Sequence, residues 1–376
     1  MSKVIARLLG CALLLLATAA TRAEIVRDLY SAEVPVASQS SAARDRAARV
    51  ALAEVLVKVS GSAEVLQNQS ISVALKGAGK HVQQYAYNRD PGPEGEQTAR
   101  FEFDGSYVTR LITEAQAPLW TANRPQVLVW LVFEDANGRQ FVNRDSTPEL
   151  AAQLMREFSR RGVPVQLPLF DLVDATAISP DQVWRLDSTV LQAASGRYNV
   201  RNVLGGRLAT LSNGSVAGDW VYLYGEDRQD RSGTLDTPQL FFENGVALVA
   251  EEMASRYAVA PSATTAEGGL SMSVAGVNNY ADYAAIVAWL ESLELVEYAN
   301  VTRIVDDKIE LRVLAQADAG QLAAIIELNE RFVPMPMAAP NPGLNPGFDP
   351  ALDPGLDPAL NPAAAVANPL SYRWQN

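Results

Sequence analysis

The sequence has 376 residues, of which 31 are lysine or arginine and 43 are aspartate or glutamate, so its formal net charge at pH 7 is −12. Such an acidic chain argues against nucleic acid or an anionic membrane surface as a partner, because both require clustered basic side chains. The single cysteine, Cys11, lies near the N-terminus. The rest of the chain therefore has no disulfide, no thiolate nucleophile and no cysteine ligand for a metal.

Residues 1–23 have the pattern of a secretory signal peptide. Two basic residues precede a stretch of 13 apolar residues, Leu8 to Ala20, and a small residue, Ala23, stands at the expected cleavage site. A membrane span would need about 20 apolar residues. The Leu-Leu-Gly-Cys sequence at Cys11 is similar to a lipobox, but most of the apolar stretch follows it, which disfavours lipidation. Cleavage would leave 353 residues from Glu24 onward and remove three basic side chains, for a net charge of −15.

The first predicted domain, residues 24–117, combines strands with helices. A strand is expected over Leu29–Val36. A long helix should begin at Ser40 or Ser41 and end at Gly61, because glycine favours the left-handed conformation that ends helices. The remaining elements are expected to be short helices at Ile71–Leu75 and His81–Tyr87, a strand at Thr98–Phe103 and a helix at Ser106–Ala117.

The second predicted domain, residues 125–258, begins with the most apolar stretch after the signal peptide. Val127–Phe133 is too short for a typical helix and lacks the alternation of a half-exposed strand. It is therefore predicted as a central strand buried on both faces, with helices on either side. A helix over Thr147–Arg161 and a parallel strand over Val163–Phe170 would complete a right-handed βαβ unit. The remaining elements are expected to be a helix at Pro180–Ala194, strands at Asn202–Leu211 and Trp220–Tyr224, and a helix at Phe241–Tyr257.

The third predicted domain, residues 268–376, follows a linker at Val259–Thr265. A strand from Leu270, a helix, a hairpin around Asp306-Asp307 and a second helix give the order βαββα, which is one strand short of a split βαβ sandwich. Residues 370–375 alternate between apolar and polar side chains, so they predict the missing strand. The domain is therefore predicted to be ferredoxin-like, with the order βαββαβ.

Residues 341–364 form a low-complexity insertion in this domain. Proline at every fourth position forbids helices and sheet ladders there, so an extended segment is predicted. It is interpreted either as a peptide ligand for a partner or as a drifting insertion without a function. The predicted fold class is thus α/β and α+β and multidomain, with a central mixed α/β sheet domain followed by a ferredoxin-like domain.

Recognisable catalytic motifs do not occur in the sequence. His81 is the only histidine, and no Gly-x-Ser-x-Gly stretch accompanies it. Gly77-Ala78-Gly79-Lys80 is similar to part of a phosphate-binding loop, but His81 occupies the position where such a loop needs serine or threonine. The sequence therefore predicts no metal site and no cofactor.

Carboxylates remain as candidates for a site. Glu134 and Asp135 follow the central strand, and Asp171 and Asp174 follow the strand predicted to end at Phe170. Because ligands of open α/β sheets gather outside the carboxyl ends of strands, these four side chains are expected to line one crevice. There they would act as an acid–base pair or bind a cation. The alternative is that Asp135 and Asp171 are ordinary turn and cap residues.

Three stretches make the sequence similar to a known family. Ser60-Gly61, the connector Pro118-Leu119-Trp120 with Arg124-Pro125, and the strand 128–133 resemble secreted gammaproteobacterial proteins grouped as domain of unknown function 2066. The resemblance covers most of the chain up to the proline repeats and implies no activity. The element order of residues 125–258 is also similar to that of the N-terminal domain of the Tol-system β-propeller protein and of a domain in the flagellar outer-ring T protein.

The sequence favours a non-catalytic periplasmic protein without an integral membrane segment after cleavage. It would be an adaptor or assembly factor of the cell envelope that acts through protein–protein contacts with unidentified envelope partners. Two alternatives use the crevice at Glu134 and Asp171. One is a carboxylate-dependent hydrolase of an envelope glycan, and the other is a small-ligand binder.

Overall fold

The computed structural model describes residues 24–89, 97–260, 269–335 and 370–375. The predicted signal peptide and the proline repeats lie outside the described residues, as does the predicted linker from residue 261 onward. The chain divides into two compact units, one made of Met1–Asp28 with Arg124–Met253 and the other of Leu29–Asn123 with Ala254–Asn376. Two short strands, β1 (Glu24–Ile25) and β5 (Asn123–Arg124), are not part of the three larger sheets.

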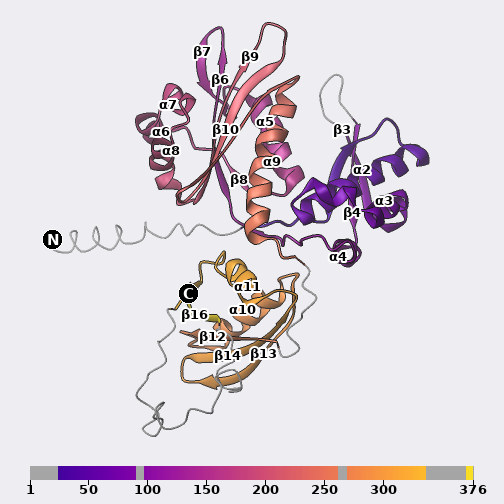
Figure 1. The fold of residues 1–376 in the computed structure, drawn as a ribbon, viewed down its shortest axis with the longest axis vertical. Helices are drawn as coiled ribbons and strands as arrows, with labels where there is room; N and C mark the ends of the chain where they lie inside the picture. The colour runs from indigo at the N-terminus through magenta and orange to yellow at the C-terminus, as the bar shows by residue number, and fades with distance from the viewer. Residues whose placement is uncertain (1–23, 90–96, 261–268, 336–369, 376) are drawn as a thin grey trace, which may run out of the picture. The chain divides into compact units, whose positions relative to one another are not determined.

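The unit that contains Arg124–Met253 is built on a six-stranded mixed sheet (Figure 1). Its strand order is β11-β10-β9-β6-β7, and β8 also pairs with β6 (Val127–Asp135). β6 runs parallel to β8 and β9 and antiparallel to β7. Every residue from Val127 to Val132 is 0% exposed, so the predicted buried central strand is confirmed. The other strands are β7 (Gly138–Phe141), β8 (Val165–Gln166), β9 (Asn202–Thr210), β10 (Val216–Tyr224) and β11 (Asp227–Leu235).

Helices cover both faces of this sheet, as the sequence predicts. In Figure 1, α6, α7 and α8 lie on one face, whereas α5 and α9 lie on the other. The bounds are α5 (Pro148–Arg161), α6 (Leu172–Ala177), α7 (Pro180–Trp184), α8 (Ser188–Ser195), η3 (Gly196–Tyr198) and α9 (Pro238–Tyr257).

Each face of the sheet has its own tryptophan-centred core. Trp130 of β6 packs with Leu128 and Val132 against buried side chains of α7 and α8 and against Ile178, which follows α6. On the opposite face, Trp220 stacks on Phe241 at a centroid distance of 4.6 Å and donates its indole N–H to the Phe241 carbonyl oxygen. The two indoles therefore anchor different helix layers on one sheet.

A buried arginine joins the start of this unit to the end of α5. Arg124 is fully buried, and its Nη1 donates to the carbonyl oxygens of Arg161 (3.0 Å) and Gly162 (2.9 Å). Carbonyl groups at a helix end lack intrahelical partners, so the guanidinium stabilises the α5 terminus. The Arg124-Pro125 stretch quoted for the family resemblance thus has a structural role.

Two predicted elements of this unit are wrong in extent. The strand predicted at Val163–Phe170 is only β8, which ends at Gln166, and Phe170 has a φ of 53°, outside the extended region. The helix predicted at Pro180–Ala194 is broken into α7 and α8 at Leu186, which has a φ of 51°. Asp187 then caps α8 by accepting from the N–H groups of Thr189 and Val190.

The second unit contains a three-stranded antiparallel sheet with the order β2-β4-β3. Helix α2 begins after Ser40, whose Oγ accepts from the Ala43 N–H, and ends at Gly61 with a φ of 79°, so both predicted helix ends are confirmed. The helix predicted at His81–Tyr87 is wrong, because His81 ends η2 and the residues from Val82 onward belong to β3, which pairs with β4. The bounds are β2 (Ser31–Pro35), α2 (Ser41–Ser60), η1 (Ala63–Gln67), α3 (Gln69–Lys76), η2 (Ala78–His81), β3 (Val82–Arg89), β4 (Gln97–Phe103) and α4 (Gly105–Glu114).

The C-terminal part of this unit is a five-stranded sheet with the order β13-β14-β12-β16-β15. The predicted terminal strand is confirmed as β16. It lies between β12, to which it is parallel, and β15, to which it is antiparallel. β15 is a further strand that the predicted βαββαβ order lacks. The bounds are β12 (Leu270–Ala275), α10 (Tyr280–Glu291), β13 (Val296–Val305), β14 (Lys308–Ala315), α11 (Ala319–Ile326), β15 (Phe332–Pro334) and β16 (Leu370–Trp374).

We expect Gly61→Ala to lower the free energy of unfolding by about 3 kcal/mol. A left-handed conformation disfavours any Cβ by about 1–2 kcal/mol, and overpacking adds a similar amount. A Cβ at Gly61 would lie 2.2 Å from the Ala254 Cβ and 3.2 Å from the Trp120 ring. Gly214→Ala is the matched control, because Gly214 has a φ of +85° with nothing within 4 Å. Denaturant titration should show the larger loss for Gly61→Ala, and equal losses would contradict the packing argument.

Candidate functional site

The first pair of predicted site residues lies at the end of β6. Glu134 accepts a hydrogen bond from Arg139 Nε at 3.1 Å, and Arg139 also pairs with Asp181 at 2.9 Å. The Arg139 guanidinium carbon lies 4.4 Å from the centroid of a Trp184 ring. Asp135 accepts from the backbone N–H of Asn137 at 2.8 Å, in the turn between β6 and β7. Glu134 is therefore connected through Arg139 to Asp181 of α7 by two ion pairs. Asp135 stabilises the turn between β6 and β7.

The second pair, Asp171 and Asp174, meets at one arginine. Arg197 donates to Asp171 through Nη1 (2.6 Å) and Nη2 (2.9 Å), and its Nη1 also lies 3.0 Å from Asp174 Oδ1. Asp171 in addition caps α6 by accepting from the Asp174 N–H at 3.0 Å. The hydrogen bonds from Arg197 hold the pKa of Asp171 well below its usual range. Both carboxylates are thus fixed by hydrogen bonds.

Asp174 is the buried centre of this network. Its side chain is 3% exposed, and its Oδ2 accepts from the Phe170 N–H (2.8 Å) and from the Tyr198 hydroxyl (2.5 Å). The same hydroxyl accepts from the Leu169 N–H at 2.8 Å. Burial raises the pKa of Tyr198 to about 12, and the hydrogen bond to Asp174 acts in the same direction. The hydroxyl therefore stays protonated at neutral pH and bridges two parts of the turn.

The network stabilises a turn that presents aliphatic side chains to solvent. Phe170 has a φ of 53°, a rare conformation for a bulky residue, and its ring packs inward at 6.0 Å from Trp130 and 5.2 Å from Phe141. Its neighbours face outward instead. Three of them are Leu169, which precedes α6, and Leu172 and Val173, which lie in the first turn of α6; they are 66%, 79% and 55% exposed, and we call the three the apolar turn.

The structure therefore brings Asp171 and Asp174 together but gives Glu134 and Asp135 other partners. The expected crevice depends on a strand that ends at Phe170, whereas β8 ends at Gln166. Four residues of turn then separate the strand end from Asp171. Sequence patterns did not predict the residues that complete the network and the apolar turn: Arg197, Tyr198, Leu169, Leu172 and Val173. An Asp-Leu-Val-Asp stretch is consistent with a capped helix start, but it does not reveal that its leucine and valine are exposed.

Three of the four predicted carboxylates are already engaged by arginine side chains. Glu134 and Asp171 are each paired with an arginine, and Asp174 is enclosed. Within the ranges that the structure describes, no three His, Cys, Asp or Glu side chains gather as a metal site would require. In the same ranges, no helix is both long and apolar enough to cross a membrane.

Comparison with known sequences identifies one match. Residues 23–121 match the family model of a domain of unknown function, DUF8605. This confirms the predicted domain of unknown function at that level, but not the specific family 2066 nor the Tol and flagellar resemblances. The match includes Ser60-Gly61 and Pro118-Leu119-Trp120 and stops before β6. No curated protein matches the chain.

The Asp171–Arg197 pair should make stability fall in acid. A carboxylate whose pKa is lower in the folded state stabilises the fold fully at pH values above its unfolded-state pKa, which is near 3.9. This stabilisation decreases as the pH falls toward the folded-state pKa. We expect the melting temperature of the wild type to exceed that of Asp171→Asn at pH 7, and the difference to shrink as the pH falls below about 4. Asparagine also caps helices well, so the variant isolates the charge. Parallel melting curves from pH 7 to pH 2.5 would contradict this expectation.

Proposed function

We propose that the protein is a non-catalytic periplasmic protein, an adaptor or assembly factor of the cell envelope that acts through protein–protein contacts. The observation that carries this proposal is the apolar turn. Three neighbouring aliphatic side chains are exposed on a backbone that Arg197, Asp174 and Tyr198 hold in place. A pre-organised turn of this kind loses little conformational freedom on binding, so its exposed apolar surface favours a protein partner.

The periplasmic location rests on the sequence of residues 1–23. Intact-mass measurement of the protein purified from the envelope fraction tests it. The expected mass is that of a chain beginning at Glu24. A diacylglycerol-modified Cys11 at the N-terminus would contradict the proposal of a free periplasmic protein.

The partner surface is tested by one substitution in the apolar turn and one matched control. Leu172→Ser removes the most exposed leucine of the turn, and Leu211→Ser makes the same change at a 41% exposed leucine after β9. Tagged wild type and both variants are used to recover proteins from the periplasm, and the recovered partner is then purified for titration. Leu172→Ser should weaken its binding at least about tenfold with an unchanged melting temperature, whereas Leu211→Ser should not. Equal binding by all three proteins would exclude this surface.

The hydrolase and small-ligand alternatives require that the carboxylates act on a substrate or ligand. Alanine at both Glu134 and Asp171 tests this requirement. The ion pairs with Arg139 and Arg197 favour a loss of stability in this variant. A variant that lost function with unchanged melting temperature would instead support the alternatives. We further propose kinship with the secreted gammaproteobacterial proteins, for which the Ser60-Gly61 and Pro118-Leu119-Trp120 stretches are the support.

A further inference from the structure

One edge strand of the three-stranded sheet has few of the features that usually protect such edges. β3 (Val82–Arg89) pairs with β4, and no other strand of the described residues pairs with it. Along its outer side, alternate residues present backbone N–H and C=O groups that a further strand would bind. No proline and no charged residue occurs from Val82 to Asn88. Eight residues of edge, about 26 Å at 3.3 Å per residue, are long enough for a bound peptide.

The other edge strands of the described residues are blocked in recognisable ways. Charges, proline, bulges and short length all discourage pairing with another chain. β7 and β15 have only four and three residues, and β13 has two register irregularities. β2 contains Glu33 and Pro35, and β11 contains Asp227, Arg228, Asp230 and Arg231. β3 has one register irregularity, between Val82 and Gln84, but it has no proline and no charge before Arg89, so it is the least protected of these edges.

The side chains of β3 are exposed on both faces of the sheet. Four consecutive residues, Gln83 to Ala86, are exposed, whereas β4 alternates between buried and exposed positions. The buried side chains of β4 include Phe101 and Phe103, which lie in the core. β3 therefore contributes little to the core, and its outer side is accessible.

Two tyrosines and an arginine line one face of this edge. Tyr85 and Tyr87 lie 5.7 Å apart in an edge-to-face arrangement, and Tyr85 is 44% exposed. Arg44 of α2 donates to the Tyr85 hydroxyl at 3.3 Å, with its guanidinium carbon 5.4 Å from the ring centroid. The carboxylate of Asp45 lies 3.9 Å from Arg44, and both side chains are exposed, so this ion pair is weak.

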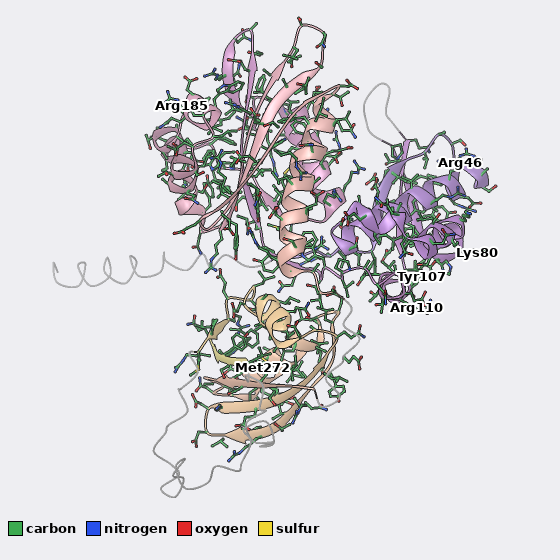
Figure 2. The ribbon with its side chains drawn as sticks, viewed as in Figure 1. Arg46, Lys80, Tyr107, Arg110, Arg185 and Met272 are labelled. Atoms are coloured by element: carbon green, nitrogen blue, oxygen red, sulfur yellow. The ribbon has the colours of Figure 1, made fainter. Side chains whose placement is uncertain are left out.

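Arg44 is the basic side chain that contacts β3 directly, through Tyr85. Figure 2 labels three exposed basic residues on α2, η2 and α4, namely Arg46, Lys80 and Arg110, and Arg110 Nε lies 4.0 Å from a carboxylate oxygen of Glu114. Two of the neighbouring carboxylates accept internal hydrogen bonds, whereas Glu102 of β4, which lies opposite Gln84, is exposed. Asp104 caps α4 and accepts from Gln83, and Glu33 accepts from Thr98 and Asn88.

We propose that β3 is the docking edge for an extended segment of a partner protein, which adds to the sheet as a fourth strand. The segment would carry β-branched or aromatic side chains at alternate positions, opposite Tyr85 and Tyr87, because such cross-strand pairs stabilise sheets. It would also carry a carboxylate within reach of Arg44. A second copy of the chain is a poorer occupant. Antiparallel self-pairing centred on Tyr85 would place the two Arg44 side chains on the same face of the joint sheet.

A synthetic strand tests this edge in the full mature chain. The probe is an acetylated and amidated Glu-Val-Thr-Val-Thr-Val-Glu peptide, and the control is the same peptide with proline at its centre. Hydrogen exchange measured by mass spectrometry should slow in fragments that cover residues 82–89 with the probe only. Exchange at the β11 edge should not change. No protection of 82–89, or equal protection by the proline peptide, would overturn the proposal.

Two variants separate edge pairing from general charge effects. Gln84→Lys places a charge on the edge and should weaken binding at least about tenfold, whereas Ser72→Lys adds the same charge on exposed α3 and should not. Arg44→Ala should weaken the binding of the glutamate-ended probe about two- to fivefold and leave the binding of a glutamine-ended probe unchanged. Equal effects of Gln84→Lys and Ser72→Lys would overturn the proposal. So would a concentration-dependent dimer that Gln84→Lys abolishes, because the edge would then belong to a second copy.

Discussion

Deletion of residues 370–376 is expected to lower the melting temperature of the C-terminal five-stranded sheet by at least about 10 °C. The deletion removes β16, which is an internal strand between β12 and β15. Its three apolar side chains, Leu370, Tyr372 and Trp374, are at most 8% exposed. Each side chain of this size contributes about 1.5–3 kcal/mol when buried, and a loss of 1 kcal/mol shifts the melting temperature of a domain of this size by about 4–8 °C.

The aromatic contacts of β16 explain why the loss should extend beyond the strand itself. Phe332 of β15 lies 5.0 Å from Trp374 and 5.0 Å from Trp289 of α10, measured between ring centroids. The Arg331 guanidinium carbon lies 3.9 Å from the centroid of a Trp374 ring, and Arg331 Nε donates to the Gln375 carbonyl oxygen. Without β16, β15 has no strand partner among the described residues, and β12 becomes an apolar edge. Differential scanning calorimetry of the full mature chain measures the effect.

Deletion of residues 341–364 is the control for the tail deletion. The Met335 N–H donates to the Ser371 carbonyl oxygen at 2.9 Å, so the two ends of the intervening segment are adjacent. Residues 336–340 and 365–369 would remain, and ten residues are ample for a connection between neighbouring antiparallel strands. Loop-closure entropy changes by about 0.6 kcal/mol per doubling of length, so this deletion should change stability by only about 1 kcal/mol. Equal effects of the two deletions would show that β16 is dispensable.

The elements that the sequence predicts well carry signals in their own residues. Ser40 and Gly61 mark both ends of α2, and the uninterrupted apolar run marks β6, because neither signal depends on distant parts of the chain. The terminal strand is predictable for the same reason. Its alternation of Leu370, Tyr372 and Trp374 with polar residues matches its burial.

The elements that were missed are decided by pairing with distant residues. β3 has no apolar alternation, because neither of its faces is buried, and only its partner β4 makes it a strand. β11 has charged side chains typical of a solvated turn, yet it pairs with β10 along its whole length. Local propensity could not identify either strand, since long-range hydrogen bonds determine both.

The candidate site shows the same limit. The sequence directs attention to Asp171 and Asp174, because carboxylates near a predicted strand end are candidates for a site. It does not reveal Arg197, which lies 23 residues beyond Asp174 in the chain and fixes both carboxylates. Nor does it reveal that β8 ends early, which separates these residues from the crevice that was expected to include Glu134.

Replacement of Trp130 by alanine is expected to lower the free energy of unfolding by about 3–5 kcal/mol, from lost transfer energy and from the cavity left behind. Trp130 is fully buried in β6, and its indole N–H donates to Ser195 Oγ at 3.0 Å. Its ring also lies 6.4 Å from Tyr198 and 6.0 Å from Phe170. The substitution should therefore also make the apolar turn more mobile, because Phe170 and Tyr198 connect that turn to Trp130.

Trp130→Phe is the matched variant, since it keeps an aromatic ring but loses the indole N–H and part of the volume. It should cost about 1–2 kcal/mol, so the order of denaturant midpoints should be wild type, phenylalanine, alanine. Hydrogen exchange of the Leu169 and Phe170 amides, which donate to Tyr198 and Asp174, reports on the turn separately. We expect these amides to exchange faster in Trp130→Ala, and we expect the β6 amides to exchange at the wild-type rate in Asp171→Asn. The two results together would show that the core stabilises the apolar turn and that the turn does not stabilise the core. A midpoint for Trp130→Ala within about 0.5 kcal/mol of wild type would mean that β6 is peripheral to the fold.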